Sequence, residues 1–113
     1  MIIFKIEQLS KWAAAQKVGV YSGAPIDLED GFIHFSTAQQ VGETLRKHFS
    51  GQSGLALIAV DTDKLGEALV WEPSRGGALF PHLYGDLMMD AVLGSTPIGD
   101  DGLLPARPEW GLQ

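Results

Sequence analysis

Phe32-Ile33-His34-Phe35-Ser36-Thr37 joins a strand pattern to the start of a helix, and this junction decides the fold. Successive side chains of a strand point to opposite faces, so His34 and Ser36 are expected on one face, opposite two apolar residues. Thr37 and Gln40 have the three-residue spacing of a capping box, in which each side chain satisfies an unpaired amide at a helix start. The sequence therefore predicts a short strand that leads directly into a helix.

Apolar periodicity on either side of this junction predicts the other elements. Val41, Leu45 and Phe49 recur at steps of four, which is typical of the buried stripe of a helix that runs to about residue 49. A second helix is expected over residues 9–18, with Ser10 as its cap and Gly19 as its stop. Its buried face is expected to include Trp12, Ala13 and Ala14, and strands are expected over residues 1–6, 32–35, 55–60, 68–73 and 89–93.

The remaining segments are expected to be connections. Residues 21–31 contain Gly, Pro and three acidic residues, Asp27, Glu29 and Asp30, and this composition predicts a loop with a solvated acidic face. Pro81 favours an edge position for the segment around it, because proline cannot donate to a sheet ladder. Residues 94–113 are rich in Gly and Pro, and we expect an irregular tail there.

The composition predicts a single α+β domain over residues 1–113, with its motifs in residues 1–93. The chain is 113 residues long and 45% hydrophobic, which favours one independently folding core. No apolar run approaches the roughly 20 residues of a spanning helix, and no leader pattern is present, so we expect a cytoplasmic protein without a membrane partner. The absence of cysteine excludes disulfides and thiolate chemistry, and a net charge of −6 disfavours a nucleic-acid partner.

Three polar motifs are candidates for the functional site, and each also has a purely structural interpretation. In the first, Ser36 and Thr37 lie beside His34 at a helix N-terminus, where unpaired amides suit a phosphate or carboxylate. The alternative is that Ser36 or Thr37 only caps the helix while His34 is a partly buried, hydrogen-bonded residue.

In the second motif, Trp71-Glu72-Pro73-Ser74-Arg75-Gly76-Gly77, Glu72 offers a general base or a partner for a sugar hydroxyl, and Arg75 offers a clamp for an anion. The alternative is a surface ion pair in a turn. In the third, Phe80-Pro81-His82-Leu83-Tyr84-Gly85, His82 and Tyr84 alternate onto one face and provide an imidazole beside an aromatic surface. The alternative there is ordinary packing.

No metal site is predicted, because His34, His48 and His82 lack the spacing of a zinc motif. His48, near the end of its helix, is expected to interact with the helix dipole. The sequence also lacks the GxSxG elbow, the Walker loop and the GxGxxG fingerprint.

The three motifs, in this order, resemble domain of unknown function family 952, an uncharacterised and mostly bacterial family, over about residues 1–93. That family is similar to the ADP-ribosyltransferase fold, which implies a split sheet, antiparallel or mixed, with two main helices and a cleft for NAD or ADP-ribose. The resemblance further implies that Ser36 lies near a nicotinamide-ribose position and that Glu72 is a counterpart of the catalytic acid. Lys5 stands where that superfamily has a first-strand His or Arg.

We therefore predict a pocket for a nucleotide, ADP-ribose or a phosphorylated sugar, in an enzyme of the ADP-ribosyl- or glycosyl-transfer type. Two alternatives stay open: a binding module that kept the cleft without catalysis, and a protein-interaction domain with an apolar patch around Trp12 and Trp110. The catalytic candidates are Glu72 and His34, and the ligand-binding candidates are Ser36, Thr37, Arg75, Gly76, Gly77, His82 and Tyr84.

Overall fold

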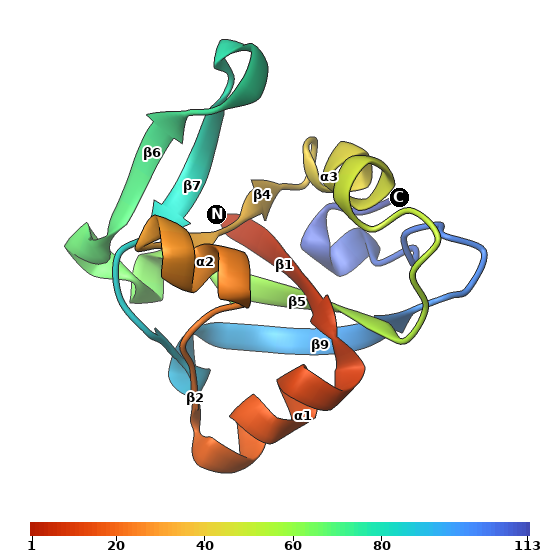
Figure 1. Cartoon of the computed structure of the whole chain (residues 1–113), viewed down its shortest axis with the longest axis horizontal. Coiled ribbons are helices and arrows are strands. Elements are labelled where there is room, and N and C mark those ends of the chain that lie inside the picture. Colours follow the sequence, from red (N-terminus) through yellow and green to blue (C-terminus); the bar gives the residue numbers. More distant parts are fainter.

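The computed structural model describes the backbone of all 113 residues and every side chain except that of Arg75. The main sheet is antiparallel and has the strand order β4-β1-β5-β9 (Figure 1). β1 (Ile2–Gln8) and β5 (Leu55–Asp61) form its centre, while β9 (Val92–Ile98) and the short β4 (Ser36–Thr37) form its edges. The α+β class is confirmed.

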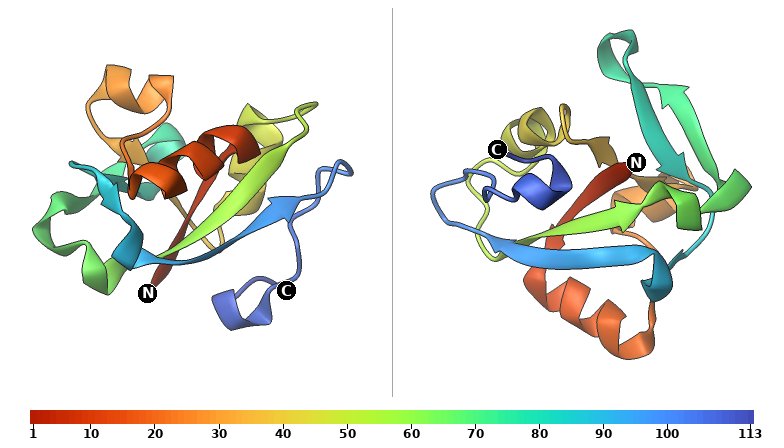
Figure 2. Two further views of the ribbon diagram at one scale, coloured as in Figure 1. Left: turned by 90° about the horizontal axis from the view of Figure 1, so that it is seen from below. Right: turned by 180° about the vertical axis from the view of Figure 1, so that it is seen from behind.

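Strand alternation divides the side chains of β1 between two cores, one on each face of the main sheet. Ile3 belongs to the core that α1 (Leu9–Val18) covers, and Phe4 belongs to the core that α3 (Val41–His48) covers. Figure 2 shows the C-terminal turn on the opposite side of the sheet from α1. Because both faces are covered, β5 is buried along nearly its whole length, as its continuous apolar run predicts.

The first helix matches its predicted range but not its predicted cap, and the second begins later than its predicted start at residues 36–37. α1 begins at Leu9 and ends at Val18, where Gly19 adopts the left-handed conformation (φ 92°) and stops it, but Ser10 does not cap it. Trp12 and Ala15 are its buried residues, whereas Ala13 and Ala14 are exposed. α3 begins only at Val41, since residues 36–37 pair with β1 before the chain turns into the helix.

A second sheet has the order β3-β7-β6. Its strands β6 and β7, with the turn between them, form an arm that projects from the body of the molecule (Figure 1). β7 (Leu79–Leu83) lies between β3 (Ile33–His34) and β6 (Leu69–Pro73), and the 3-10 turn η3 (Arg75–Gly77) connects β6 to β7. A two-stranded ladder joins β2 (Val20–Tyr21) to β8 (Leu87–Met88). Further 3-10 turns are η1 (Thr62–Lys64), η2 (Gly66–Ala68), η4 (Met89–Ala91) and η5 (Pro108–Trp110).

Residues 21–31 are not simply a solvated loop, because they contain the helix α2 (Pro25–Asp30). Pro25 occupies the first turn, where a missing amide costs nothing, and Asp27 accepts a hydrogen bond from the backbone N–H of Ala24 at 2.8 Å. Asp27 is only 1% exposed, so the predicted acidic surface is wrong at this residue.

The C-terminal segment is more ordered than its Gly and Pro content predicts. β9 continues to Ile98 and accommodates Pro97, since an edge strand has one side without a ladder. Trp110 and Leu112 are buried against the core that contains Phe4. The tail is therefore part of the domain core.

Pro81 also differs from its prediction, because β7 is the central strand of its sheet. The carbonyl of Pro81 accepts the N–H of Phe35 at 3.0 Å, just beyond the end of β3. The amide and the carbonyl of one residue point to the same side of a strand, so the amide that Pro81 lacks would face Phe35. Phe35 lies beyond the end of β3, so the ladder between β3 and β7 loses no hydrogen bond there. No helix in the described chain is long and apolar enough to cross a membrane.

Candidate functional site

The chain changes sheets between His34 and Ser36, and this change separates two residues that were expected to share a face. His34 lies in β3 and pairs with β7, whereas Ser36 lies in β4 and pairs with β1. Ser36 is buried, and its hydroxyl lies 2.8 Å from the hydroxyl of Thr44 on α3. The prediction of a common His34–Ser36 face is therefore wrong, because it assumed one continuous strand.

His34 instead joins the residues of the second and third motifs. It lies directly opposite His82 in the β3–β7 ladder, and the centres of the two rings are 5.4 Å apart. Directly opposite residues of an antiparallel pair point to the same face, and the register of β6 with β7 places Glu72 on this face too. Tyr84 joins it through a hydrogen bond to Glu72. We call His34, Glu72, His82 and Tyr84, together with Phe32, the histidine face.

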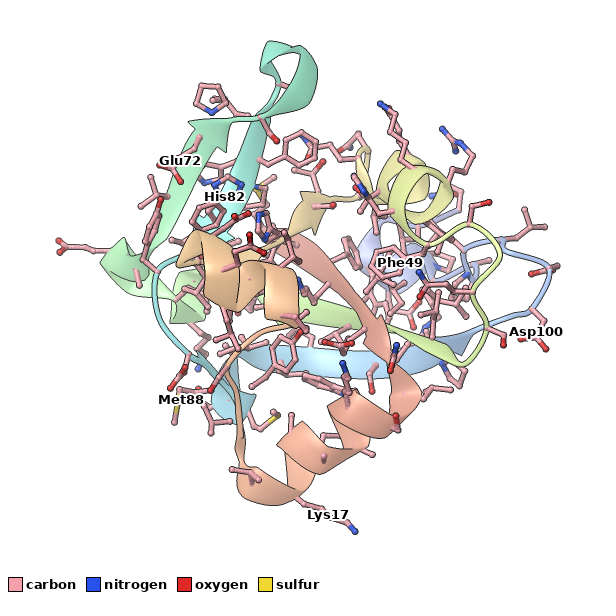
Figure 3. The ribbon with its side chains drawn as sticks, in the orientation of Figure 1. Lys17, Phe49, Glu72, His82, Met88 and Asp100 are labelled. Carbon is pink, nitrogen blue, oxygen red and sulfur yellow. The ribbon has the colours of Figure 1, made fainter. Side chains whose placement is uncertain are left out.

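Glu72 is the hydrogen-bonding centre of the histidine face. Its Oε1 lies 2.8 Å from Nδ1 of His82, and it also accepts the hydroxyl of Tyr84 at 2.8 Å. The hydrogen bond from His82, and after it the one from Tyr84, lowers the pKa of the Glu72 carboxyl. The bond to Glu72 in turn raises the pKa of the Tyr84 hydroxyl. Figure 3 shows Glu72 and His82 beside each other where the arm meets the body.

Phe32 adds an aromatic surface to this polar group. Its ring stacks on that of His82, with centres 4.1 Å apart and an interplanar angle of 26°. The same ring lies 4.6 Å from the centre of the His34 ring and 5.2 Å from that of Tyr84. The ring of Phe32 thus contacts the rings of His34, His82 and Tyr84, which carry polar atoms at their edges.

Beneath the histidine face lies a buried charged group built on Asp27. Its Oδ1 accepts the backbone N–H of His34 at 3.1 Å and lies 2.6 Å from the ring Nδ1 of His34. Its Oδ2 accepts Nζ of Lys5 at 2.7 Å. Nε2 of His34 lies 2.9 Å from a carboxylate oxygen of Asp30, so both ring nitrogens of His34 contact an acid.

The environment of Asp27 favours its charged form. Burial by itself raises the pKa of this carboxyl, but the hydrogen bond from His34 and the charge of Lys5 outweigh burial and bring the pKa to about 2. Burial also lowers the pKa of Lys5, and the Asp27 carboxylate opposes that effect. Lys5 is thus a buried partner of Asp27 and is 7% exposed.

The other predicted site residues have structural contacts or lie elsewhere. Thr37 and Gln40 form the predicted reciprocal bonds, at 3.0 Å and 3.2 Å, and these hold the turn between β4 and α3. Gly76 and Gly77 lie in the connecting turn of the arm with left-handed backbones. The side chain of Arg75 lies outside the described part of the structure.

A cleft of about 200 Å³ opens beside the histidine face, between α2 and the turn that follows β7. Typical ligand pockets occupy roughly 300 to 1,000 Å³, so this cleft has room for part of a ligand rather than a dinucleotide. Among the described side chains, no group of three His, Asp or Glu residues is arranged to hold a metal ion. The residues that line the cleft are Ser22, Asp27, Leu28, Gly31, Phe32, Ile33, Gly85 and Asp86.

Sequence reasoning missed Asp27, Asp30 and Phe32 as members of this region. One usable signal was present: Ala24-Pro25-Ile26-Asp27 has a proline followed two residues later by an acid, a combination typical of a helix start. No pattern announces that this acid is buried. The exposed apolar patch expected around Trp12 and Trp110 is absent from the described structure, since both residues are buried, on opposite faces of the main sheet.

Comparisons with known proteins give a consistent result. The crystal structure of protein CC0527 from Caulobacter crescentus is 46% identical, with a TM-score of 0.83 over 86% of this chain and 85% of that chain. Its solution NMR structure is 46% identical, with a TM-score of 0.78 over 89% of each chain. No curated protein matches the chain significantly. Residues 6–95 match the family described as "Protein of unknown function (DUF952)", and the chain belongs to that family.

Proposed function

We propose that the histidine face is the active site of a small-molecule enzyme of the ADP-ribosyl- or glycosyl-transfer type, which acts on a nucleotide, ADP-ribose or a phosphorylated sugar. The observation that carries this proposal is the hydrogen-bonded group of His82, Glu72 and Tyr84. A carboxylate on Nδ1 of an imidazole fixes the ring and leaves Nε2 for proton transfer, an arrangement used widely in general acid–base catalysis.

The group suits substitution at the anomeric carbon of a sugar. An acceptor hydroxyl or water forms the new C–O bond, while the bond to the leaving group breaks and its electron pair stays with the leaving group. The acceptor must lose a proton, and His82 supports this step because Glu72 holds the proton of Nδ1 and stabilises the imidazolium that forms. The Glu72 carboxylate also supplies negative charge near the cationic sugar of such a transition state.

The rings of the histidine face support binding of a flat group. Phe32 is half-buried and Tyr84 is 46% exposed, so part of an aromatic surface remains open to a ligand. Many kinds of flat ligand ring can stack on such side chains, and the polar edges of the histidines orient the ligand. The adjacent cleft of about 200 Å³ has a size suited to one ring or one sugar.

The charges of the region favour the sugar or ring of a ligand over its phosphates. Asp27, Asp30 and Glu72 are acidic, and the buried Lys5 is already committed to Asp27. A phosphate would therefore depend on Arg75, which belongs to the arm that carries Glu72. This makes Arg75 the residue whose removal should discriminate phosphorylated from unphosphorylated ligands.

A non-catalytic binding module is the second candidate, and the position of Lys5 favours it. In the resembling superfamily a first-strand His or Arg contributes to the ligand site, whereas Lys5 is buried and bonded to Asp27. Loss of that contact is compatible with a cleft that binds a ligand without converting it. Such a module would show saturable binding and no product.

A thermal-shift screen against NAD, ADP-ribose, mononucleotides and sugar phosphates tests the proposal. A ligand at a hundred times its dissociation constant adds roughly 2.7 kcal/mol, which corresponds to a rise on the order of 10 °C in Tm for a chain of this length. Arg75→Ala should abolish the shift for phosphorylated ligands, while Lys17→Ala, which removes a charge from the far end of the molecule, should preserve it (Figure 3). No shift with any ligand would contradict the site.

Product analysis of the ligand that gives a shift separates the two candidates. The enzyme should release a leaving group or transfer a sugar, and Glu72→Gln should lower the rate by about 100-fold or more, as expected for a lost acid–base group. Saturable binding without product would support the binding module. A variant that converts substrate at the normal rate would remove Glu72 from the mechanism.

A further inference from the structure

We propose that Asp27 is the positioning residue of the histidine face: it fixes the orientation of the His34 ring and holds a proton on Nδ1, so that Nε2 is the nitrogen presented to a ligand. The inference deepens the proposed function and rests on it where the use of His34 is concerned. The geometry of the Asp27 group carries the structural part independently.

The four hydrogen bonds of the Asp27 carboxylate divide into two pairs with different tasks. Oδ2 accepts Nζ of Lys5 at 2.7 Å, which anchors α2 to β1, and the backbone N–H of Ala24 at 2.8 Å, which caps the start of α2. Oδ1 serves His34 alone, through its backbone N–H at 3.1 Å and its ring Nδ1 at 2.6 Å. A purely structural ion pair would need only the first pair of bonds.

The carboxylate form of Asp27 determines the direction of the bond to the ring. A carboxylate can only accept hydrogen bonds, and Lys5 beside a carboxyl that is 1% exposed stabilises the carboxylate form. Nδ1 of His34 must then be the donor, as in histidines whose second nitrogen is used for chemistry. Lys5 therefore acts on His34 through Asp27, without contacting the ligand surface itself.

Nε2 of His34 has a more replaceable partner. It lies 2.9 Å from Asp30, and the two side chains are 34% and 40% exposed, so water screens the contact. A ligand oxygen can take the place of Asp30 with little loss. His82 has the same plan, since Glu72 holds its Nδ1. Two directly opposed histidines thus have carboxylate-bound Nδ1 atoms on one sheet face.

Nitrogen-15 NMR of the histidine rings tests this assignment without any ligand. In the unmodified protein, Nδ1 of His34 should carry a proton that exchanges slowly, because its acceptor is buried. An unprotonated Nδ1 would overturn the proposal, and this result needs no variant. It is also independent of whether the protein is an enzyme.

Asp27→Asn provides the matched perturbation, because the two side chains have nearly the same shape. The ammonium of Lys5 requires the amide oxygen, which turns the amide NH₂ toward His34. Nδ1 then becomes an acceptor, and the bond from the backbone N–H of His34 is lost. Nδ1 should therefore lose its proton, so that the ring proton lies on Nε2, toward Asp30. Lys5→Met is the control: it removes the same ion pair but keeps the carboxylate, so the Nδ1 proton should remain.

The two variants also separate this proposal from the proposed function. With a ligand from the screen, Asp27→Asn should weaken binding or turnover about tenfold more than Lys5→Met, although both lose the ion pair. A folded Asp27→Asn protein that keeps the Nδ1 proton would overturn the positioning role. A relocated proton with unchanged ligand binding would overturn the use of His34 at the site, while leaving the Glu72 part of the proposed function intact.

Discussion

Protonation of Asp27 in acid should remove about 2 kcal/mol from the free energy of unfolding. Burial alone would raise the pKa of this carboxyl, but His34 and Lys5 bring it to about 2 from an ordinary value of 3.8. A carboxyl with a depressed folded pKa stabilises the protein above its unfolded pKa and loses that effect as the pH falls through its folded pKa. Since one pKa unit is worth about 1.4 kcal/mol, the difference between 3.8 and about 2 gives the stated magnitude.

Urea denaturation at pH 5, 4, 3 and 2, for the unmodified protein and for Asp27→Asn, measures this effect. The other carboxyls titrate in both proteins, so the difference in unfolding free energy between the two isolates Asp27. This difference should shrink by about 2 kcal/mol between pH 5 and pH 2. In a Lys5→Met background the change should begin at a higher pH, because the ammonium no longer stabilises the carboxylate.

Parallel curves, with the same difference in unfolding free energy at every pH, would refute this reasoning. They would mean that Asp27 titrates alike in the folded and unfolded chain, and hence that Lys5 and His34 do not stabilise its charge. A difference that grows toward low pH would have the wrong sign for a paired carboxylate. Either result would remove the electrostatic basis of the group beneath the histidine face.

Three further changes have defined outcomes. Trp110→Ala should cost about 3 to 5 kcal/mol in urea denaturation, because it empties a buried position of the core and not of a flexible tail. Gly23→Ala should destabilise strongly and alter the His34 ring signals, since its Cβ would lie 2.8 Å from Cβ of Asp27 and its φ is 112°. Tyr84→Phe should raise the pKa of Glu72 toward 4.5, as read by carbon-13 NMR, because one of two donors is lost, and an unchanged titration would contradict the contact.

Much of the fold follows from local patterns. The range of α1, the buried run of β5 and the stripe that includes Val41 and Leu45 each depend on periodicity and on a nearby stop signal. These signals act within a few residues, so they are visible in the sequence. Glu72 was a candidate from its place at a strand end beside a Gly-rich loop, and His82 and Tyr84 were candidates from alternation. Hydrogen bonds to Glu72 bring the three together.

The errors share a different physical origin, which is tertiary pairing that no local pattern encodes. His34 pairs with β7, but Ser36 already pairs with β1, and the side chain of Ser36 is buried. Asp27 looks like a loop acid until Lys5, which is 22 positions away, supplies its counter-charge. The tail was predicted to be irregular because the residues that pack against Trp110 lie on strands far away in the sequence.

Titration of the nitrogen-15-labelled protein with ADP-ribose, followed by backbone amide NMR, tests the site most directly. Saturable shifts should cluster on β3, β6 and β7, around His34, Glu72 and His82, and Arg75→Ala should weaken them. A second cleft, of about 520 Å³, lies by Phe49 and Asp100 on the other side of the molecule and serves as the internal comparison (Figure 3). Shifts confined to that cleft, or none at millimolar ligand, would contradict a ligand site on the histidine face.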